Sequence, residues 1–388
     1  MIQRTIFIPI FFSLYLIQAT AQPYAIGHRS LSYTDPAHSR NIPVHIYYPA
    51  TSAGDNVAVA AGAFPLIVFG HGFAMAYSAY ANVWEAVVPQ GYIMVLPTTE
   101  GSLLPAPNHE AFGLDLRFLN TKMKSENTNA SSPFYQKIGT TSALMGHSMG
   151  GGASFLAAAG NNDITAHITF APAETNVSAI HAATQITVPD LIFYGQNDGV
   201  TPPAEHQLSM YDSLGTSCKT IIGIKGGGHC YFANYNFNCA TGELSTSPQP
   251  TITRAEQHVV LFDFLIPYMN YILKNNTQDG QLFLDSLNLS GRIIFQRNCT
   301  TTQLNEVPND NILIYPNPLG SRSFLTLAYL PENENAEVEI NDIRGRTLSR
   351  KSLKGSSTID MSGIPSGTYI LKILTQERII SRKLVVLQ

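Results

Sequence analysis

Apolar runs and segments of helical length alternate along the chain up to about residue 275. Residues 25–48 alternate enough to predict two initial strands, and the continuous apolar runs at 65–69 and 92–96 are typical of strands buried on both faces. Further strands are expected at 142–145, 167–170, 191–194 and 220–224, and helices at 77–89, 109–123, 151–159, 204–214 and 254–274. Strands that alternate with helices predict a mostly parallel sheet covered on both faces, which is an α/β fold.

The pattern changes after about residue 275. The polar run from Asn298 to Asn311 is typical of a linker. Short strands separated by turn signals follow it, at 312–315, 324–327, 337–340 and 368–373. This second pattern predicts a small all-β sandwich rather than a continuation of the parallel sheet.

Composition narrows the class of partner. The chain has 388 residues, a length that suggests two domains. Charged residues make up 13% of it, against an average of about 25%, and its formal net charge is −4. This balance gives no reason to expect a nucleic-acid partner. We expect a monomer.

The N-terminus predicts export. Arg4 precedes an apolar run at 6–17, and Ala19-Thr20-Ala21 follows it. A positive start, a short apolar core and an A-x-A end describe a secretory signal peptide cleaved after Ala21. A membrane anchor would need about twenty apolar residues, more than this run supplies.

Four cysteines form an even set in a chain that leaves the cytoplasm, which favours disulfides. Three pairings of Cys218, Cys230, Cys239 and Cys299 are open. We favour Cys230–Cys239, which would close a small loop beside His229. The sequence holds no C-x-x-C or H-E-x-x-H motif, so we expect neither a metal nor another cofactor.

The stretch Gly146-His147-Ser148-Met149-Gly150 has the G-x-S-x-G pattern of a nucleophile elbow. The short apolar run 142–145 precedes it and a good helix former, 151–159, follows it. Strand, sharp turn and helix are the context that this elbow requires, and the glycines allow the two backbones to approach closely. Ser148 would then lie at a helix N-terminus, where developing negative charge is favoured.

A reactive serine needs a base and an acid that orients the base. Asp198 is the best acid, since it follows the predicted strand 191–194 directly. His229 is the best base, because it follows the strand 220–224 in a glycine-rich loop that can fold back towards Ser148. The three residues follow separate strands in the chain order serine, acid, histidine that α/β-hydrolases show.

Other ionisable residues compete for these roles. Glu174 is the rival acid, because it follows the preceding strand. Asp190 precedes its strand and would lie at the wrong end of the sheet. His147 is expected to point away from the reaction centre and to hydrogen-bond behind the elbow, and His206 and His258 fall in predicted helices with structural roles.

An oxyanion hole should combine two backbone N–H groups. One is that of Met149, directly after the nucleophile. The other comes from the loop Gly70-His71-Gly72-Phe73-Ala74, where we choose Phe73. The side chains of Phe73 and Met149 are then expected to contact the substrate. The alternative is that His71-Gly72 forms only a tight turn.

Four motifs carry a family resemblance. His71-Gly72-Phe73, the run Gly146 to Gly152, Asn197-Asp198 and Gly227-Gly228-His229-Cys230 resemble the secreted cutinase and polyester-hydrolase group, and dienelactone-hydrolase-like esterases share parts of them. The resemblance implies a serine carboxylesterase with a shallow cleft and no lid. Polyester hydrolases of this group place a tryptophan just after the strand that follows the elbow helix. Here that place reads Phe170-Ala171-Pro172-Ala173-Glu174.

The C-terminal segment resembles the type A sorting domain of proteins exported by the type IX secretion system. The matching features include Tyr315-Pro316-Asn317-Pro318, Asp342-Ile343-Arg344-Gly345-Arg346 and Ser366-Gly367-Thr368-Tyr369-Ile370. The resemblance implies contact with that secretion machinery and export across the outer membrane, followed by release or surface attachment. A carbohydrate-binding or adhesive module is the alternative, but no aromatic platform supports it.

These features predict a signal peptide at 1–21, an α/β-hydrolase catalytic domain at 22–300, a linker at 301–311 and a sorting domain at 312–388. The predicted activity is hydrolysis of small esters, with polyesters as an extension, through an acyl-enzyme on Ser148. A lipase or peptidase of the same fold and a surface binding protein without chemistry are the alternatives.

Overall fold

The computed structural model describes most of the chain as two compact units, Met1–Thr300 and Thr301–Gln388, which we treat separately. The described residues are 24–300, 313–315, 317, 319, 324–328, 335–342, 346–375 and 379–386. The predicted signal peptide, 1–21, and the predicted linker, 301–311, lie outside them.

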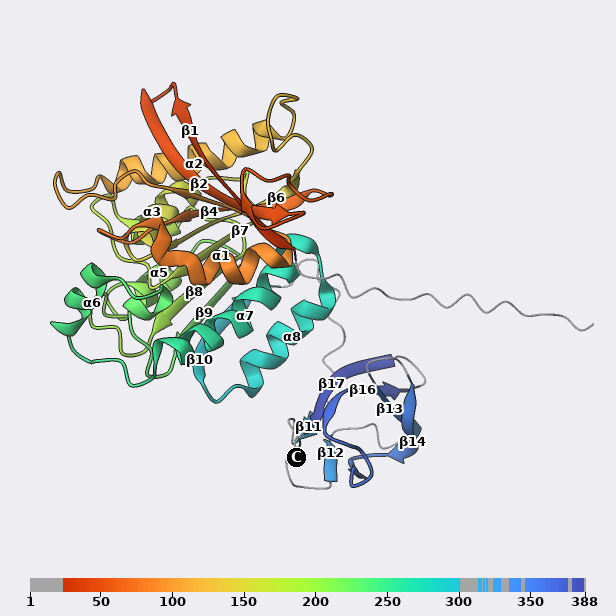
Figure 1. Ribbon diagram of the computed structural model, residues 1–388. Coiled ribbons are helices and arrows are strands. Elements are labelled where there is room, and N and C mark those ends of the chain that lie inside the picture. The colour runs from red at the N-terminus through yellow and green to blue at the C-terminus, as the bar shows by residue number, and fades with distance from the viewer. Residues whose placement is uncertain are drawn as a thin grey trace, which may run out of the picture. The chain divides into compact units, whose positions relative to one another are not determined.

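A ten-stranded sheet forms the centre of the first unit, with the strand order β10-β9-β8-β7-β6-β4-β5-β2-β1-β3 (Figure 1). Six neighbouring strands in its middle pair in parallel: β9, β8, β7, β6, β4 and β5. They are flanked by β2 and β10 in antiparallel pairings. The bounds are β1 (Ala25–Asp35), β2 (Arg40–Ala50), β3 (Gly54–Asp55), β4 (Phe64–Gly70), β5 (Ile93–Pro97), β6 (Ile138–His147), β7 (Ala166–Phe170), β8 (Asp190–Gly195), β9 (Cys218–Ile224) and β10 (Ile293–Cys299).

Helices cover both faces of this sheet, as the alternating pattern predicted (Figure 1). Alternate residues of β4 enter two separate buried clusters, Leu66 on the face covered by α2 to α5 and Ile67 on the face covered by α1, α7 and α8. The helices are α1 (Ala81–Val87), α2 (His109–Glu126), α3 (Met149–Ala158), α4 (Ala179–Ala183), α5 (Gln207–Ser213), α6 (Phe237–Leu244), α7 (Arg254–Lys274) and α8 (Thr277–Leu289), with 3₁₀ turns η1 (Tyr77–Tyr80), η2 (Val88–Gln90) and η3 (Cys230–Phe232). The predicted α/β fold class is confirmed.

Two elements of the first unit follow the change of pattern near residue 275 and lie before the predicted domain boundary at residue 300. Helix α8 and strand β10 follow that point, and β10 pairs with β9 in register. Asn298 and Cys299, which the polar run assigned to a linker, therefore belong to the sheet. That assignment was wrong for these two residues because pairing with Lys219 and Cys218 of β9 satisfies their backbone groups, which the local side-chain pattern does not reveal.

The second unit consists of two antiparallel sheets, β11-β12-β15 and β14-β13-β16-β17. Apolar residues of both sheets, among them Leu325, Ile340 and Leu371, form one buried cluster. The predicted small all-β domain is confirmed. Its strands are β11 (Leu313–Tyr315), β12 (Phe324–Ala328), β13 (Asn335–Asp342), β14 (Thr347–Lys354), β15 (Ser357–Asp360), β16 (Gly367–Leu374) and β17 (Ile379–Val386). Within the described parts of both units, no helix has the length and apolar character to cross a bilayer.

Candidate active site

Ser148 lies in the sharp turn between β6 and α3, at the carboxyl edge of the parallel strands. Its φ of 54° and ψ of −122° lie in a region that non-glycine residues rarely adopt. A Cβ on Gly146 would lie 2.3 Å from the carbonyl oxygen of Gly150, and one on Gly150 would lie 2.2 Å from the carbonyl carbon of Gly70. The turn is therefore possible only with glycine at both ends, as the motif predicted.

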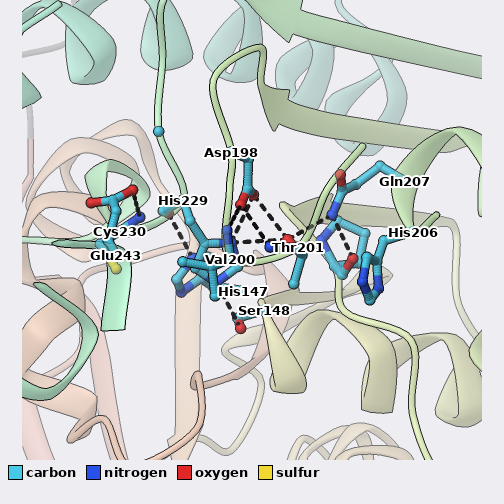
Figure 2. Close-up of polar contacts among 12 residues, drawn as sticks. His147, Ser148, Asp198, Val200, Thr201, His206, Gln207, His229, Cys230 and Glu243 are labelled. Atoms are coloured by element: carbon cyan, nitrogen blue, oxygen red, sulfur yellow. Dashed lines mark hydrogen bonds and ion pairs between the residues drawn. The ribbon is translucent and has the colours of Figure 1, made fainter. Parts of the chain in front are cut away.

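The structure brings Ser148, His229 and Asp198 together in one chain of hydrogen bonds (Figure 2). The Ser148 hydroxyl lies 2.9 Å from His229 Nε2, and His229 Nδ1 lies 2.7 Å from Asp198 Oδ2. Asp198 and His229 are each 1% exposed, and Ser148 is 9% exposed. The carboxylate fixes the proton of the imidazole on Nδ1, which leaves Nε2 free to accept the proton of the serine.

The loop after β8 holds the Asp198 carboxylate through its backbone. Asp198 Oδ1 accepts hydrogen bonds from the N–H groups of Val200, at 2.9 Å, and Thr201, at 2.8 Å. Oδ2 accepts from His229 and, at 2.9 Å, from the Thr201 hydroxyl. Four donors thus satisfy the carboxylate in a buried position.

Helices α6 and α7 hold the loop that carries His229. The Gln257 side chain bonds both backbone groups of Gly228, accepting from its N–H and donating to its carbonyl oxygen at 2.9 Å each. The buried Glu243 accepts from the N–H of Cys230 at 3.1 Å. A disulfide joins Cys230 to Cys239 in α6, which is the pairing that the sequence favoured.

A second disulfide joins Cys218 to Cys299. These residues are register partners on β9 and β10, so the bond ties the antiparallel edge strand to the sheet. The sequence left this pairing open because it depends on a strand, β10, that the apolar pattern did not predict.

His147 connects three parts of the site from behind the elbow, as its position suggested. Its Nδ1 accepts from the Tyr80 hydroxyl at 2.9 Å, and its Nε2 donates to the carbonyl oxygen of His229 at 3.1 Å. The Tyr80 oxygen in turn accepts from the N–H of Gly72 at 2.7 Å. The loop 70–74, the turn at Ser148 and the loop that carries His229 are thereby joined. Nothing in the sequence around Tyr80 signalled this role.

Burial governs the charge state of His147. Burial lowers the pKa of its imidazole well below the usual 6.5, and the nearby His229 lowers it further. Burial also lowers the pKa of His71, in the loop 70–74. Both rings are therefore neutral in the folded protein at neutral pH.

Stability should fall as the pH drops from about 7 towards 5. Below pH 6.5 the unfolded chain binds protons on His71 and His147 that the folded chain does not, so acid favours unfolding. A histidine that binds a proton only in the unfolded chain contributes at most about 1.4 kcal/mol per pH unit. Urea midpoints at pH 7.5, 6.5 and 5.5 measure the effect. A midpoint that stays constant or rises towards pH 5.5 would contradict it.

An open cleft of about 430 Å³ lies over Ser148. Phe73 and Met149, the two residues chosen for the oxyanion hole, line it together with Ser148. Met149 is the first residue of α3, where backbone N–H groups have no acceptor within the helix. The remaining lining residues are Ala106, Pro107, His109, Ala173, Glu174, Val200 and Thr201.

The competing residues have other partners. Glu174 lines the cleft, but its Oε2 accepts from the N–H of Ile180 at 3.0 Å. His206 precedes α5, and its Nδ1 accepts from the N–H of Glu174 at 2.9 Å. His258, in α7, contacts the carbonyl oxygen of Ala233 through Nε2 at 3.3 Å.

Asp190 is the first residue of β8, at the amino end of the strand, and belongs to a second serine–histidine–aspartate set. Its Oδ2 lies 2.6 Å from His167 Nδ1, and His167 Nε2 lies 2.8 Å from the Ser154 hydroxyl. Ser154 and His167 are 0% exposed and Asp190 is 1% exposed. Ser154 donates its own proton to the carbonyl oxygen of Gly151 at 2.6 Å. This set is sealed from substrate, so its role is structural.

Comparison with known proteins gives two family matches and several relatives. The family model described as PET hydrolase-like matches residues 13–246, more than half of the chain. The model described as secretion system C-terminal sorting domain matches residues 313–387.

The curated relatives include cutinases of the genus Thermobifida. Cutinase est1 of Thermobifida alba is 29% identical over 173 residues, which are 44% of this chain and 52% of that protein. Cutinase 1 of Thermobifida cellulosilytica is 24% identical over 216 residues, which are 55% of this chain and 74% of that protein. The chain thus spans about half of the length of the first relative and about three quarters of the second.

Proposed function

The chain belongs to the PET hydrolase-like family, and from this premise we propose that it hydrolyses carboxylic esters through an acyl-enzyme on Ser148. The observation that carries the proposal is the hydrogen-bonded chain Ser148–His229–Asp198 at the base of the open cleft. Membership of the family supports ester hydrolysis as the class of reaction.

In the proposed mechanism, Ser148 Oγ attacks the ester carbonyl while His229 Nε2 takes the hydroxyl proton. Asp198 stabilises the resulting imidazolium through Nδ1. The N–H groups of Met149 and Phe73 stabilise the oxyanion, a contribution of about 2.7–4 kcal/mol per donor in enzymes of this type. His229 then gives the proton to the leaving alcohol. Water next attacks the acyl-enzyme while His229 takes its proton, and the return of that proton to Ser148 Oγ releases the acid.

We propose small esters and aliphatic polyesters as substrates. The cleft is open, and the connection between β7 and β8 contains only the five-residue helix α4, which is too short for a lid. Ala173 lines the cleft near the place where polyester hydrolases of this group carry a tryptophan. A methyl group there offers no ring to stack on an aromatic repeat unit.

The second unit is a secretion system sorting domain, which implies export by the type IX system across the outer membrane. We propose that residues 1–21 are removed as a signal peptide before that step. The mature hydrolase would then act outside the cell, either released or attached to the surface.

A matched pair of substrates tests the proposed reaction. The purified protein should hydrolyse nitrophenyl butyrate and leave the nitroanilide of the same acyl group intact, because a peptidase would cleave the anilide as well. An aliphatic polyester film should release soluble acid faster than a poly(ethylene terephthalate) film. Cleavage of the anilide, or an inert nitrophenyl ester, would refute the proposal.

A further inference from the structure

We propose that Thr201 is a positioning residue of this site, whose hydroxyl, oriented by Gln207, holds Asp198 and the imidazole of His229 in their working arrangement. The inference rests on the proposed function, because the hydroxyl has this task only if the three residues perform chemistry. The site prediction from sequence did not include Thr201, although it lies three residues after Asp198.

The Thr201 hydroxyl lies at the junction of three polar groups (Figure 2). Its oxygen is 2.9 Å from Asp198 Oδ2, 3.0 Å from His229 Nδ1 and 2.9 Å from Gln207 Nε2. Thr201 is 5% exposed and Gln207 is 0% exposed. Water therefore competes little for these bonds, and each acts over a short distance in a buried setting.

The chemistry of the neighbours determines where the hydroxyl proton goes. Gln207 Nε2 can only donate, and His229 Nδ1 carries a proton in the reactive form of the ring. Asp198 Oδ2 is thus the one acceptor of the three. The hydroxyl must donate to the carboxylate, and its lone pairs face the Nδ1–H of His229 and the amide of Gln207. In this direction the hydroxyl and the carboxylate both favour a proton on Nδ1.

Gln207 supports this direction. Its Nε2 also donates to the carbonyl oxygen of Pro172 at 2.8 Å, so both of its protons are used. Its Oε1 is buried with no hydrogen-bond partner among the described residues. A buried oxygen without a partner is unfavourable. The amide of Gln207 nevertheless has this orientation, in which its two N–H bonds point to the Thr201 hydroxyl and the Pro172 carbonyl oxygen.

The loop does not need the hydroxyl for its fold. The backbone N–H groups of Val200 and Thr201 already hold Asp198 Oδ1, and the N–H of Asp198 bonds the carbonyl oxygen of Gly195 at 3.1 Å. A residue without a hydroxyl at position 201 would keep all of these backbone bonds. The hydroxyl acts on the other oxygen, Oδ2, which is the one that contacts His229.

The test compares Thr201→Val, which has a similar shape without the hydroxyl, with Thr201→Ser, which keeps it. For a soluble nitrophenyl ester, Thr201→Val should lower kcat about tenfold with KM changed less than about twofold, because orientation of the base is lost while the cleft persists. Thr201→Ser should retain kcat within about threefold of the unsubstituted chain. Thermal unfolding of each variant shows that it is folded.

Thr169→Val is the matched control. Thr169 is 0% exposed in β7, and its hydroxyl has no hydrogen-bond partner among the described residues. The same chemical change there should leave kcat and KM as they are. Loss of activity in Thr169→Val as large as that in Thr201→Val would indicate a general packing effect and would overturn the proposal.

A double variant tests the role of Gln207. If Gln207 acts through the Thr201 hydroxyl, Gln207→Leu should lower kcat in the unsubstituted chain and have no further effect in Thr201→Val. If the two substitutions lower kcat independently, so that their fold-changes multiply in the double variant, the role assigned to Gln207 is overturned. An unchanged kcat in Thr201→Val, or a Thr201→Ser as slow as Thr201→Val, would overturn the whole inference while the esterase function stands. A chain without esterase activity would remove both.

Discussion

Ser148→Ala is expected to lower kcat for a nitrophenyl ester by about a millionfold, the scale seen when a serine hydrolase loses its nucleophile. The remaining groups can still bind substrate and stabilise an oxyanion, but no atom within reach of His229 Nε2 can attack the carbonyl. KM should change little, because the methyl group of alanine leaves the cleft open. Initial rates over a wide range of enzyme concentration measure the loss.

Ser154→Ala is the control for this variant. Ser154 belongs to the buried set with His167 and Asp190. This set has the same three residue types as Ser148, His229 and Asp198 and similar hydrogen-bond distances between them. Its removal should leave kcat per folded molecule unchanged. Retention of activity in Ser148→Ala, or its loss in a folded Ser154→Ala, would mean that the wrong serine has been assigned.

Asp198→Asn should lower kcat by about ten-thousandfold. The backbone N–H groups of Val200 and Thr201 require an acceptor at Oδ1, so the asparagine must place its oxygen there and its NH₂ group towards His229. Nδ1 would then have to accept a hydrogen bond, and the ring proton would move to Nε2. In that form the ring cannot take the proton of Ser148.

The pH-independent kcat of the Asp198→Asn protein measures this effect, with thermal unfolding as the check on folding. Glu174, the rival acid, provides the decisive contrast. If Asp198→Asn keeps most of its activity while Glu174→Gln loses it, the acid lies after β7 rather than after β8.

Sequence patterns predicted the elements that are buried on both faces. The continuous apolar runs of β4 to β9 can be accommodated only inside a covered sheet, and the chain order of Ser148, Asp198 and His229 after separate strands follows from that sheet. The elbow was predictable for a steric reason, because few other contexts need glycine on both sides of a serine at a strand–helix turn.

Elements whose partners are distant in the chain could not be predicted in this way. Strand β10 lies at the sheet edge and has an apolar start but a polar end, and its pairing with β9 and the disulfide Cys218–Cys299 depend on a contact between segments far apart in the chain. The roles of Tyr80 and Gln207 could not be predicted for the same reason. Each is an ordinary polar residue in the sequence, and only the fold brings Tyr80 to His147 and Gln207 to Thr201. Short helices such as α4 and α6 give too little periodicity to distinguish them from loops.

Covalent labelling of the intact protein with a fluorophosphonate measures whether Ser148 is an activated nucleophile, because the reagent requires an activated serine but no choice of ester. We expect one adduct per molecule, mapped by peptide mass to Ser148 and absent from Ser148→Ala. We also expect no adduct on Ser154, which is buried and donates its proton elsewhere. A protein that stays unlabelled, as a binding protein of this fold would, or an adduct on any other serine would contradict the assignment of Ser148 as the nucleophile.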